Sequence, residues 1–194
     1  MPRCRKNLIY IFAIILLYIF YCPGISYAAQ KPDITVFFSP RDNCALEILK
    51  RIDSAKSSID IAMYYFTSRP LAQALIDVKK RNVKVRVFLD GNQRTEKFSK
   101  ANYLTNNGIS VKINSNAAGL MHNKFCVIDN KIVITGSYNW TAAADLQNDE
   151  NLIIIESTDT AEKYAQQFEK LWNNRAPDKM RYKDKDRLEK IEDY

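Results

Sequence analysis

The residues best suited to chemistry lie in one short stretch of the chain. His122 and Lys124 are two positions apart in the most β-prone part of the sequence, so on a strand both side chains project from the same face. An imidazole can act as a nucleophile or as a general acid, and an ammonium group beside it attracts negative charge. The pair therefore predicts a site for an anionic substrate.

A second group of polar residues follows the next β-prone run. Gly136 allows a sharp turn where that run ends, and Ser137 is predicted to cap a short helix that continues through Asn139 to Ala144. The start of such a helix offers free backbone N–H groups beside a hydroxyl and a carboxamide. This predicts a phosphate-binding cradle that differs from the nucleotide P-loop, whose sequence GxxxxGK[ST] is absent from the chain.

Each of these residues also has an ordinary interpretation. A lone histidine is more often a surface residue than a catalyst, and a lone lysine is usually solvated. Asp129 has a place in a turn, and Ser137 and Asn139 have places as a cap and as a left-handed turn residue. Their occurrence together between His122 and Asn139 favours an active site over these separate interpretations.

Around this stretch, β-rich runs alternate with segments of helical period, which predicts a layered α/β domain. The predicted strands are 35–38, 59–66, 83–89, 109–113, 124–128, 131–135 and 151–156. The predicted helices start after Asn43 and Ser68, span about 95–106, and run from Asp159 or Thr160 to a point before Pro177. The turn residues Asp129 and Asn130 predict a tight hairpin.

The two ends of the chain differ from this core. Basic residues precede an apolar run, Leu8–Cys22, and the small-residue exit Ser26–Ala28, so residues 1–28 are predicted to be a secretory signal peptide. The alternative is an uncleaved anchor, because the run extended by three residues nearly reaches the roughly 20 residues that a membrane span requires. The catalytic domain is then expected at 29–177, followed by a charged, solvated tail at 178–194.

Charge and cysteine content add weaker constraints. The chain carries 29 basic and 22 acidic residues, and loss of the leader leaves 26 against 22, a net charge of +4. This mild excess favours polyanions or anionic membranes without selecting either. Cys44 and Cys126 lie among apolar residues and are predicted to be buried free thiols. With one histidine and no Cys/His cluster, a zinc site is not expected.

The combination H-x-K-x(4)-D-x(6)-G-S-x-N resembles the signature of the phospholipase D superfamily. It is formed here by His122, Lys124, Asp129, Gly136, Ser137 and Asn139. The residue order over roughly 33–174 is similar to the short single-motif branch, which includes bacterial Nuc-type endonucleases and mitochondrial cardiolipin hydrolases. Glu150 falls where that branch carries a carboxylate paired with the active-site histidine. The resemblance implies an α/β/α fold with a central mixed sheet flanked by helices.

The resemblance also implies a mechanism. His122 of one subunit attacks phosphorus and forms a phosphohistidine, while His122 of a second subunit protonates the leaving oxygen and later activates water. The phosphate oxygens are held by Lys124, Ser137 and Asn139. Glu150 fixes the imidazole tautomer. Asp129 belongs to the catalytic set of the motif, but its place beside the turn favours structural support. Side chains supply the positive charge, so neither a metal nor another cofactor is expected.

Counting histidines predicts a homodimer. The chain contains one histidine, whereas attack and protonation from opposite sides of phosphorus use two. A twofold axis through the site would supply the pair, so the active site is expected to straddle a subunit interface.

The compartment follows from the leader and from one tripeptide. Asn139-Trp140-Thr141 would accept an N-linked glycan, which would block the proposed cradle. This favours bacterial export to the periplasm or the medium, or a membrane-anchored protein if the leader is retained.

The motif specifies the bond and leaves the substrate open. A nonspecific endonuclease on DNA or RNA is favoured, with basic residues that could contact a phosphate backbone at Lys79, Lys80, Arg81, Lys84, Arg86, Arg94 and Lys97. A solvated surface explains these residues equally well. The alternative is a phospholipase D acting on phosphatidylcholine or cardiolipin, for which 117–121 and 64–66 form either an apolar rim or part of the core. A nucleic-acid-binding domain without activity is disfavoured, because the reactive set is complete.

Overall fold

The computed structural model describes residues 31–115 and 119–173. All of them belong to one unit, Lys31–Tyr194. The predicted signal peptide, the helix end before Pro177 and the predicted charged tail lie outside the described residues. Among the residues that are described, no helix has the length and apolar character needed to cross a membrane.

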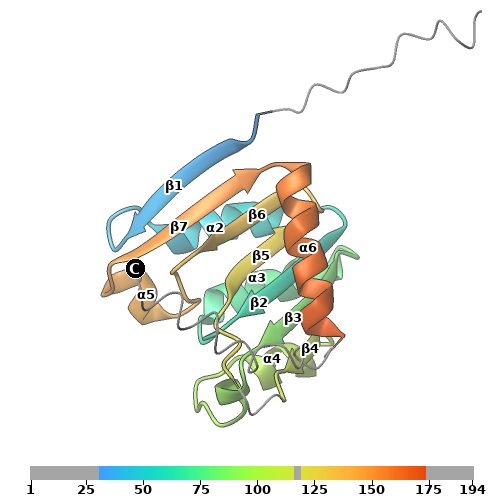
Figure 1. The fold of residues 1–194 in the computed structure, drawn as a ribbon. Helices are drawn as coiled ribbons and strands as arrows, with labels where there is room; N and C mark the ends of the chain where they lie inside the picture. The colour runs from blue at the N-terminus through green and yellow to red at the C-terminus, as the bar shows by residue number, and fades with distance from the viewer. Residues whose placement is uncertain (1–30, 116–118, 174–194) are drawn as a thin grey trace, which may run out of the picture. The chain divides into compact units, whose positions relative to one another are not determined.

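Seven strands form one mixed sheet in the order β1-β7-β6-β5-β2-β3-β4 (Figure 1). Their bounds are β1 (Asp33–Ser39), β2 (Ser58–Met63), β3 (Lys84–Leu89), β4 (Ser110–Ile113), β5 (Lys124–Ile128), β6 (Ile132–Gly136) and β7 (Glu150–Glu156). β2, β3 and β4 pair in parallel, while the pairs β2/β5, β5/β6, β6/β7 and β7/β1 are antiparallel. The predicted α/β fold with a central mixed sheet is confirmed.

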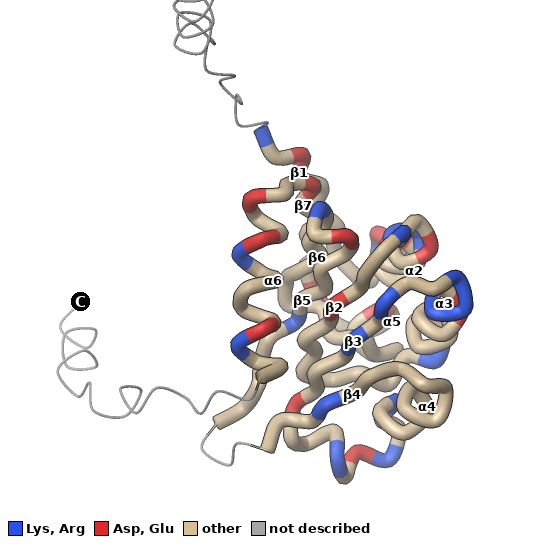
Figure 2. The backbone as a smooth tube through the Cα atoms, turned by 90° about the vertical axis from the view of Figure 1, so that its right-hand side faces the viewer, with Lys and Arg blue, Asp and Glu red and all other residues tan. Residues whose placement is uncertain are grey.

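The helices cover both faces of this sheet. Their bounds are α2 (Cys44–Ser54), α3 (Arg69–Lys80), the 3-10 helix η1 (Gly91–Arg94), α4 (Ala101–Asn106), α5 (Ala142–Leu146) and α6 (Thr158–Trp172). Figure 2 shows α6 on one side of the sheet and α2, α3 and α4 on the other. The layering is therefore α/β/α.

Alternation along the strands sends apolar side chains into both layers. On β2, Ile59, Ile61 and Met63 join the core beneath α2 and α3, while Ala62 joins the core beneath α6. The edge strand β1 is different, because Ile34, Val36 and Phe38 stay exposed on one of its faces. The core that positions the site is thus built mainly on the inner strands.

Both cysteines of the described unit lie in this core. Cys44 and Cys126 are free and are 0% and 1% exposed, which confirms the predicted buried thiols. Burial raises the pKa of Cys44 to about 11, with help from the nearby charges of Asp145 and Asp42. Burial also raises the pKa of Cys126 well above its usual value.

Helix starts follow the sequence signals in part. The Ser68 hydroxyl accepts a hydrogen bond from the Leu71 N–H (3.4 Å), with Pro70 in the first turn of α3, as predicted. Asn43 precedes α2 as predicted, but its side chain makes no capping bond. Its backbone is left-handed (φ 51°), whereas a capping side chain reaches the helix from an extended conformation.

The predicted helix at 95–106 is wrong over its first half. The chain forms η1 before it, then an irregular loop, and α4 starts only at Ala101. The buried Asp90 carboxylate caps η1 by accepting the Asn92 N–H (2.9 Å), and the Lys100 N–H donates to the Phe66 carbonyl (3.0 Å). These bonds hold the connection in a shape that local propensity does not specify.

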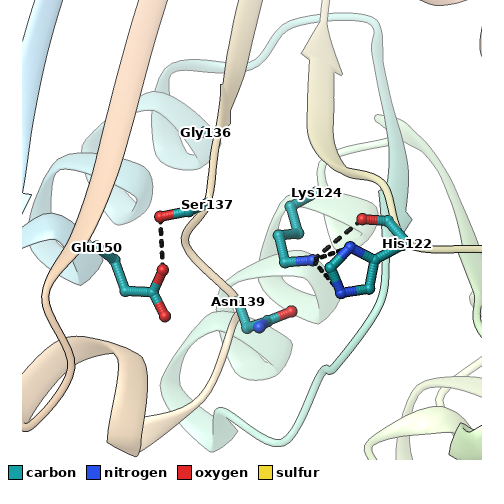
Figure 3. Close-up of a pocket in the computed structure, with 6 residues that line it drawn as sticks. All are labelled: His122, Lys124, Gly136, Ser137, Asn139 and Glu150. Atoms are coloured by element: carbon teal, nitrogen blue, oxygen red, sulfur yellow. Dashed lines mark hydrogen bonds between the residues drawn. The ribbon is translucent and has the colours of Figure 1, made fainter. Parts of the chain in front are cut away.

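The ends of three neighbouring inner strands lie on the same side of the sheet. The start of β5, the end of β6 and the start of β7 lie close together there (Figure 3). The end of β2 joins them, because Met63 pairs with Lys124. β2 stops at Met63, three residues before its predicted end, and the following segment takes hydrogen bonds outside the sheet. The Trp140 N–H donates to the Tyr65 carbonyl (3.1 Å).

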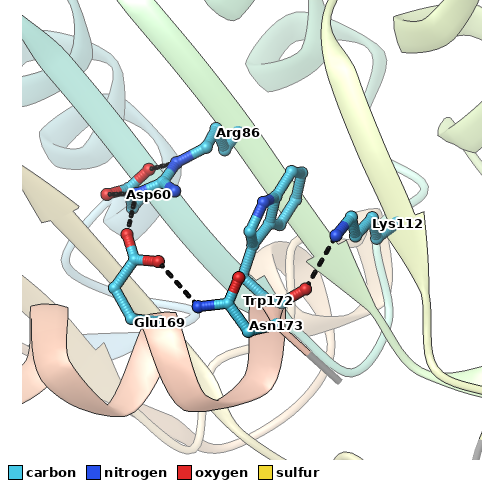
Figure 4. Close-up of polar contacts among 6 residues, drawn as sticks. All are labelled: Asp60, Arg86, Lys112, Glu169, Trp172 and Asn173. Atoms are coloured by element: carbon cyan, nitrogen blue, oxygen red, sulfur yellow. Dashed lines mark hydrogen bonds and ion pairs between the residues drawn. The ribbon is translucent and has the colours of Figure 1, made fainter. Parts of the chain in front are cut away.

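Arg86 anchors α6 to the sheet (Figure 4). Its guanidinium donates to both carboxylate oxygens of Asp60 on the neighbouring strand (2.7 and 2.8 Å) and to Glu169 of α6 (2.7 Å). It also lies over the rings of Phe168 and Trp172, 4.8 and 5.4 Å from their centroids. The hydrogen bonds to Asp60 raise the pKa of Arg86, and the bond from Arg86 lowers the pKa of Glu169. Arg86 is therefore occupied, which corrects its assignment as a candidate substrate contact.

The predicted hairpin between β5 and β6 is confirmed. Asp129 and Asn130 both have positive φ (53° and 52°), as a two-residue turn of this kind requires. The Asp129 carboxylate accepts the backbone N–H groups of Lys56, Ser57 and Ser58 at 2.7 to 3.0 Å, and the Ser57 hydroxyl at 2.8 Å. Burial raises the pKa of Asp129, but these hydrogen bonds together bring it below its usual range.

Arg86→Met is expected to lower the free energy of unfolding by about 3–5 kcal/mol, because it leaves Asp60 without its partner in a nearly buried position. The side chain of Asp60 is 13% exposed. Urea unfolding measures the loss. The double variant Asp60→Leu with Arg86→Met should recover most of it. Lys80→Met, which removes a pair whose lysine is 69% exposed, is the matched control and should cost about 1 kcal/mol or less. Equal losses in the two single variants would contradict the anchoring role.

Asp129→Asn is expected to lower the free energy of unfolding by about 1–3 kcal/mol at neutral pH, because its NH2 group faces backbone donors. The pKa of Asp129 is lower in the folded chain, so its stabilisation is present above the unfolded pKa and is lost as pH falls through the folded pKa. The difference between wild type and variant should therefore shrink below about pH 4. Unfolding measured across pH tests this, with the exposed Asp53→Asn as control. A difference that is constant with pH would refute it.

Candidate active site

Six residues line one pocket of about 430 Å³: His122, Lys124, Gly136, Ser137, Asn139 and Glu150 (Figure 3). They come from the segment before β5, the start of β5, the end of β6 and the loop after it, and the start of β7. Every predicted site residue except Asp129 is therefore brought to one place, together with the glycine of the motif.

His122 and Lys124 lie against each other in this pocket. The Lys124 ammonium is 3.3 Å from each ring nitrogen of His122 and donates to the His122 carbonyl at 3.0 Å. β5 starts at Lys124, as predicted, so His122 lies just before the strand, and the two side chains are not brought together by a shared strand face. Burial lowers the pKa of Lys124, and the charge of Glu150 partly opposes this shift. An anion in the pocket would meet an imidazole and an ammonium group together.

Tyr64 is a site residue whose role the sequence did not reveal. Its ring centroid is 4.3 Å from that of His122 at an angle of 57°, and the Lys124 ammonium is 4.8 Å from the same ring centroid. Such contacts fix the imidazole and hold the cation by its attraction to the ring face. In the sequence Tyr64 was assigned to an apolar rim or to the core. No signal in the sequence places Tyr64 here, because its position depends on the pairing of Met63 with Lys124.

Ser137 does not cap a helix, which corrects the predicted cradle. Thr141 occupies the cap of α5, and its hydroxyl accepts the Ala144 N–H (3.1 Å). The Ser137 N–H is already bound to the Asn151 carbonyl (3.1 Å). The Ser137 hydroxyl donates to Glu150 (2.5 Å) and accepts the Asn151 N–H (3.0 Å). Strand pairing with β7, and not a helix terminus, therefore shapes this wall of the pocket.

Gly136 makes that pairing possible. Its φ is 136°, and a Cβ at this position would lie 2.2 Å from the Asn151 carbonyl oxygen. Real Cβ atoms do not approach backbone this closely, so only glycine fits between β6 and the start of β7.

Asn139 is oriented by its own hydrogen bond. Its side-chain oxygen accepts the Tyr65 N–H (3.2 Å), so the NH2 group is left as the donor. A donor NH2 on the pocket wall suits a phosphate oxygen and would repel a cationic group.

Glu150 contacts Ser137 and Asn148 in the single chain. The Asn148 side chain donates to it at 3.2 Å. No hydrogen bond or ion pair joins it to His122 among the described residues. The predicted pairing of this carboxylate with an imidazole stays a prediction.

Asp129 lies apart from the pocket. It follows the last residue of β5, at the opposite end of the strand from Lys124, and its carboxylate is filled by backbone N–H groups and a hydroxyl. The geometry supports its structural role and gives no support to its place in the catalytic set.

The basic residues considered for substrate binding separate into two groups. Lys79, Lys80, Arg81 and Lys84 lie at the end of α3 and the start of β3, and parallel pairing with β2 puts this end opposite the pocket. Arg94 and Lys97 follow the C-terminal end of β3, on the pocket side. No group of three or more His, Cys, Asp or Glu side chains is placed to hold a metal ion in the described part of the chain.

Comparison with known proteins agrees with this geometry. The family model described as cardiolipin synthase, PLD-like domain, matches residues 48–172. Phospholipase D of Rickettsia conorii is 42% identical over 146 residues, covering 75% of this chain and 70% of that protein. Mitochondrial cardiolipin hydrolase of Xenopus laevis is 34% identical over 136 residues, covering 70% of this chain and 64% of that protein.

Solved structures show the same fold. Nuc from Salmonella typhimurium, a phospholipase D family member, is 35% identical with a TM-score of 0.70, covering 74% of this chain and 96% of that one. NucT from Helicobacter pylori is 29% identical with a TM-score of 0.67, covering 74% of this chain and 98% of that one. The family match over residues 48–172 includes every strand except β1 and all six residues of the pocket, and with it the chain belongs to the phospholipase D superfamily, in the branch with a single His-Lys-Asp motif, whose members are phosphodiester hydrolases.

Proposed function

We propose that the protein is a metal-independent nuclease that cleaves phosphodiesters through a phosphohistidine on His122. The observation that carries this proposal is the Lys124 ammonium within 3.3 Å of both imidazole nitrogens in an open pocket. A phosphodiester resists attack because it is anionic and its alkoxide leaves poorly. A nucleophile beside a fixed cation answers the first difficulty, and an acid on the far side of phosphorus answers the second.

The proposed reaction has two displacements at phosphorus. A lone pair on one imidazole nitrogen forms a bond to phosphorus, the bond to the leaving oxygen breaks, and a second imidazolium gives its proton to that oxygen. Water then attacks phosphorus and passes a proton to the second imidazole, while the P–N bond of the phosphohistidine breaks, which restores both imidazoles. Lys124 and the NH2 group of Asn139 bind the nonbridging oxygens. Positive charge from Lys124 and the imidazolium replaces a divalent ion in this scheme.

The second imidazole is proposed to come from a second copy of the chain. Each chain has one histidine, and its pocket lies at the strand ends formed by the start of β5, the end of β6 and the start of β7. A twofold axis beside these strand ends would bring two His122 rings to one phosphate. Because no hydrogen bond or ion pair joins Glu150 to His122 within the described chain, its proposed pairing with an imidazole fits the His122 of a second subunit.

Nucleic acid is the proposed substrate. It is supported by the likeness to Nuc-type endonucleases and by Arg94 and Lys97 on the pocket side of the sheet. Phospholipid is the second candidate, favoured by the relatives named phospholipase D and cardiolipin hydrolase and by the exposed Leu120 close to His122. Export to the periplasm or medium, or anchoring by a retained leader, is part of the same proposal.

Purified protein in a chelator should cleave plasmid DNA or single-stranded RNA and leave phosphatidylcholine and cardiolipin intact. Acid quenching of the reaction should not be used, since phosphohistidine is labile there; alkaline quenching should trap a labelled phosphoenzyme. His122→Ala should lose at least about 10³-fold in rate and trap none, because it removes the nucleophile. Lys84→Gln, at the opposite end of the sheet, is the control. Cleavage of lipids alone would refute nucleic acid as the substrate. A requirement for Mg²⁺ would refute the metal-independent mechanism.

Mixing wild type with His122→Ala tests the shared site. If one phosphate needs two imidazoles from two chains, activity should fall as the square of the wild-type fraction after the subunits exchange, because mixed dimers are inactive. Independent chains would give a linear fall and would contradict the proposal. Lys84→Gln mixed in the same way should leave activity unchanged. Light scattering should report twice the mass of one chain.

A further inference from the structure

An exposed aromatic side chain lies on the stretch from the last residue of η1 to the residue before α4, here called the 94–100 loop (Arg94–Lys100). Phe98 is 61% exposed and belongs to neither hydrophobic core. Most of this ring therefore contributes nothing to the burial of apolar surface that stabilises the fold. The ring is therefore free to contact a molecule outside the fold.

The backbone around Phe98 is held in place although its ring is free. The Phe98 N–H donates to the Glu96 carboxylate (3.1 Å), and the Phe98 carbonyl accepts from the Lys100 ammonium (2.9 Å). The Ser99 N–H donates to the Glu96 carbonyl (3.1 Å). A ring presented from a braced loop loses little conformational freedom when it binds something.

η1 and the 94–100 loop together are held at both ends by hydrogen bonds to segments that lead into the pocket. Before η1, Asp90 is 1% exposed, and its carboxylate accepts the Met121 N–H (2.7 Å), directly before His122. At the end of the loop, the Lys100 N–H donates to the Phe66 carbonyl (3.0 Å), two residues after Tyr64. Figure 1 shows the connection between β3 and α4 below the sheet, on the side where β3 ends and β5 begins. Hydrogen bonds thus tie this stretch to residues close to His122 and Tyr64 in the chain.

The loop also carries unpaired positive charge. Arg94 and Lys97 are exposed, and neither forms an ion pair within residues 31–115 and 119–173. By contrast, Lys80, Arg81 and Arg86 each have an acidic partner. The Lys97 ammonium lies 5.5 Å from the centroid of the Phe98 ring. An aromatic face among cations that lack acidic partners matches the chemistry of an unpaired nucleotide, which offers a flat base and an anionic phosphate.

We propose that the 94–100 loop is a second contact site for nucleic acid, in which Phe98 stacks on an unpaired base while Arg94 and Lys97 bind neighbouring phosphates. It rests on the proposed nuclease function and adds to it a preference for single strands, because a base within a duplex has no free face. The scissile phosphate lies at His122, and the stacked base belongs to a nucleotide farther along the same strand.

The test compares three substrates with the full chain in chelator: a short single-stranded oligonucleotide, the same oligonucleotide made abasic at every position beyond the two nucleotides that flank the cleaved bond, and bis(p-nitrophenyl) phosphate. Phe98→Ala should raise KM for the first by about 5- to 150-fold, the loss expected for one stacked base. It should leave kcat/KM for the small diester within about twofold, because that ester reaches only the pocket. On the abasic strand, wild type and variant should have the same KM.

Matched variants separate stacking from other effects. Phe98→Trp should keep or lower KM, while Phe98→Leu should resemble Phe98→Ala, because stacking needs the ring. Ile34 is 54% exposed near the start of β1, which pairs with the end of β7 at Glu156. Ile34→Ala is the control and should leave KM for all three substrates unchanged. Arg94→Gln with Lys97→Gln removes two phosphate contacts and should reduce the slope of log KM against log salt by about 1.4 units, whereas Lys84→Gln should leave the slope unchanged.

The outcomes distinguish the loop from the proposed function. Hydrolysis of the small diester without cleavage of any oligonucleotide by wild type would overturn the nuclease proposal itself. Oligonucleotide cleavage with unchanged KM in Phe98→Ala would overturn the loop site alone. If Phe98→Ala instead weakens binding to vesicles of phosphatidylcholine and cardiolipin and spares the oligonucleotide, the loop contacts membrane, and the nucleic-acid site is refuted.

Discussion

The pocket depends on the position at which β5 enters the sheet. Lys124 is the first residue of β5 and pairs with Met63, the last residue of β2, so the chain enters β5 beside the point at which it leaves β2. Tyr64, directly after β2, therefore lies against His122, just before β5. A shift of β5 by one residue would turn every side chain to the opposite face and would remove Lys124 from the imidazole. The hydrophobic alternation of β5, with Cys126 and Ile128 on one face and Phe125 and Val127 on the other, holds this register.

The opposite wall obeys a similar constraint between β6 and β7. Gly136 pairs with Leu152, and the backbone beyond it approaches Asn151 so closely that a side chain on Gly136 has no room. Ser137 is thereby delivered to Glu150. One wall of the site is therefore built where β2 ends beside the start of β5, and the other where β6 ends beside the start of β7. In both walls, strand pairing places the polar side chains.

The sequence specified the parts of this arrangement that are local. The buried β-rich runs and the Ser68 signal gave strands and helices close to their observed bounds, and the hairpin at Asp129 keeps most of the motif within two adjacent strands. What it could not specify depends on partners distant in the chain. The N–H of Ser137 is taken by Asn151 of β7, so the expected helix start moved to Thr141. The segment after Arg94 has helical character, yet Phe66 and Asp90 hold its ends as a loop. Tyr64 could be placed beside His122 only once the pairing of β2 with β5 was known.

The two buried thiols have a practical consequence. Alkylating reagents need a thiolate at an accessible surface, and Cys44 and Cys126 offer neither in the folded unit. Their labelling rates would instead follow transient opening, with Cys44 reporting release of the first turn of α2 and Cys126 reporting separation of the central strands. The unit thus contains two intrinsic probes of its own breathing, one peripheral and one central, without any engineered label.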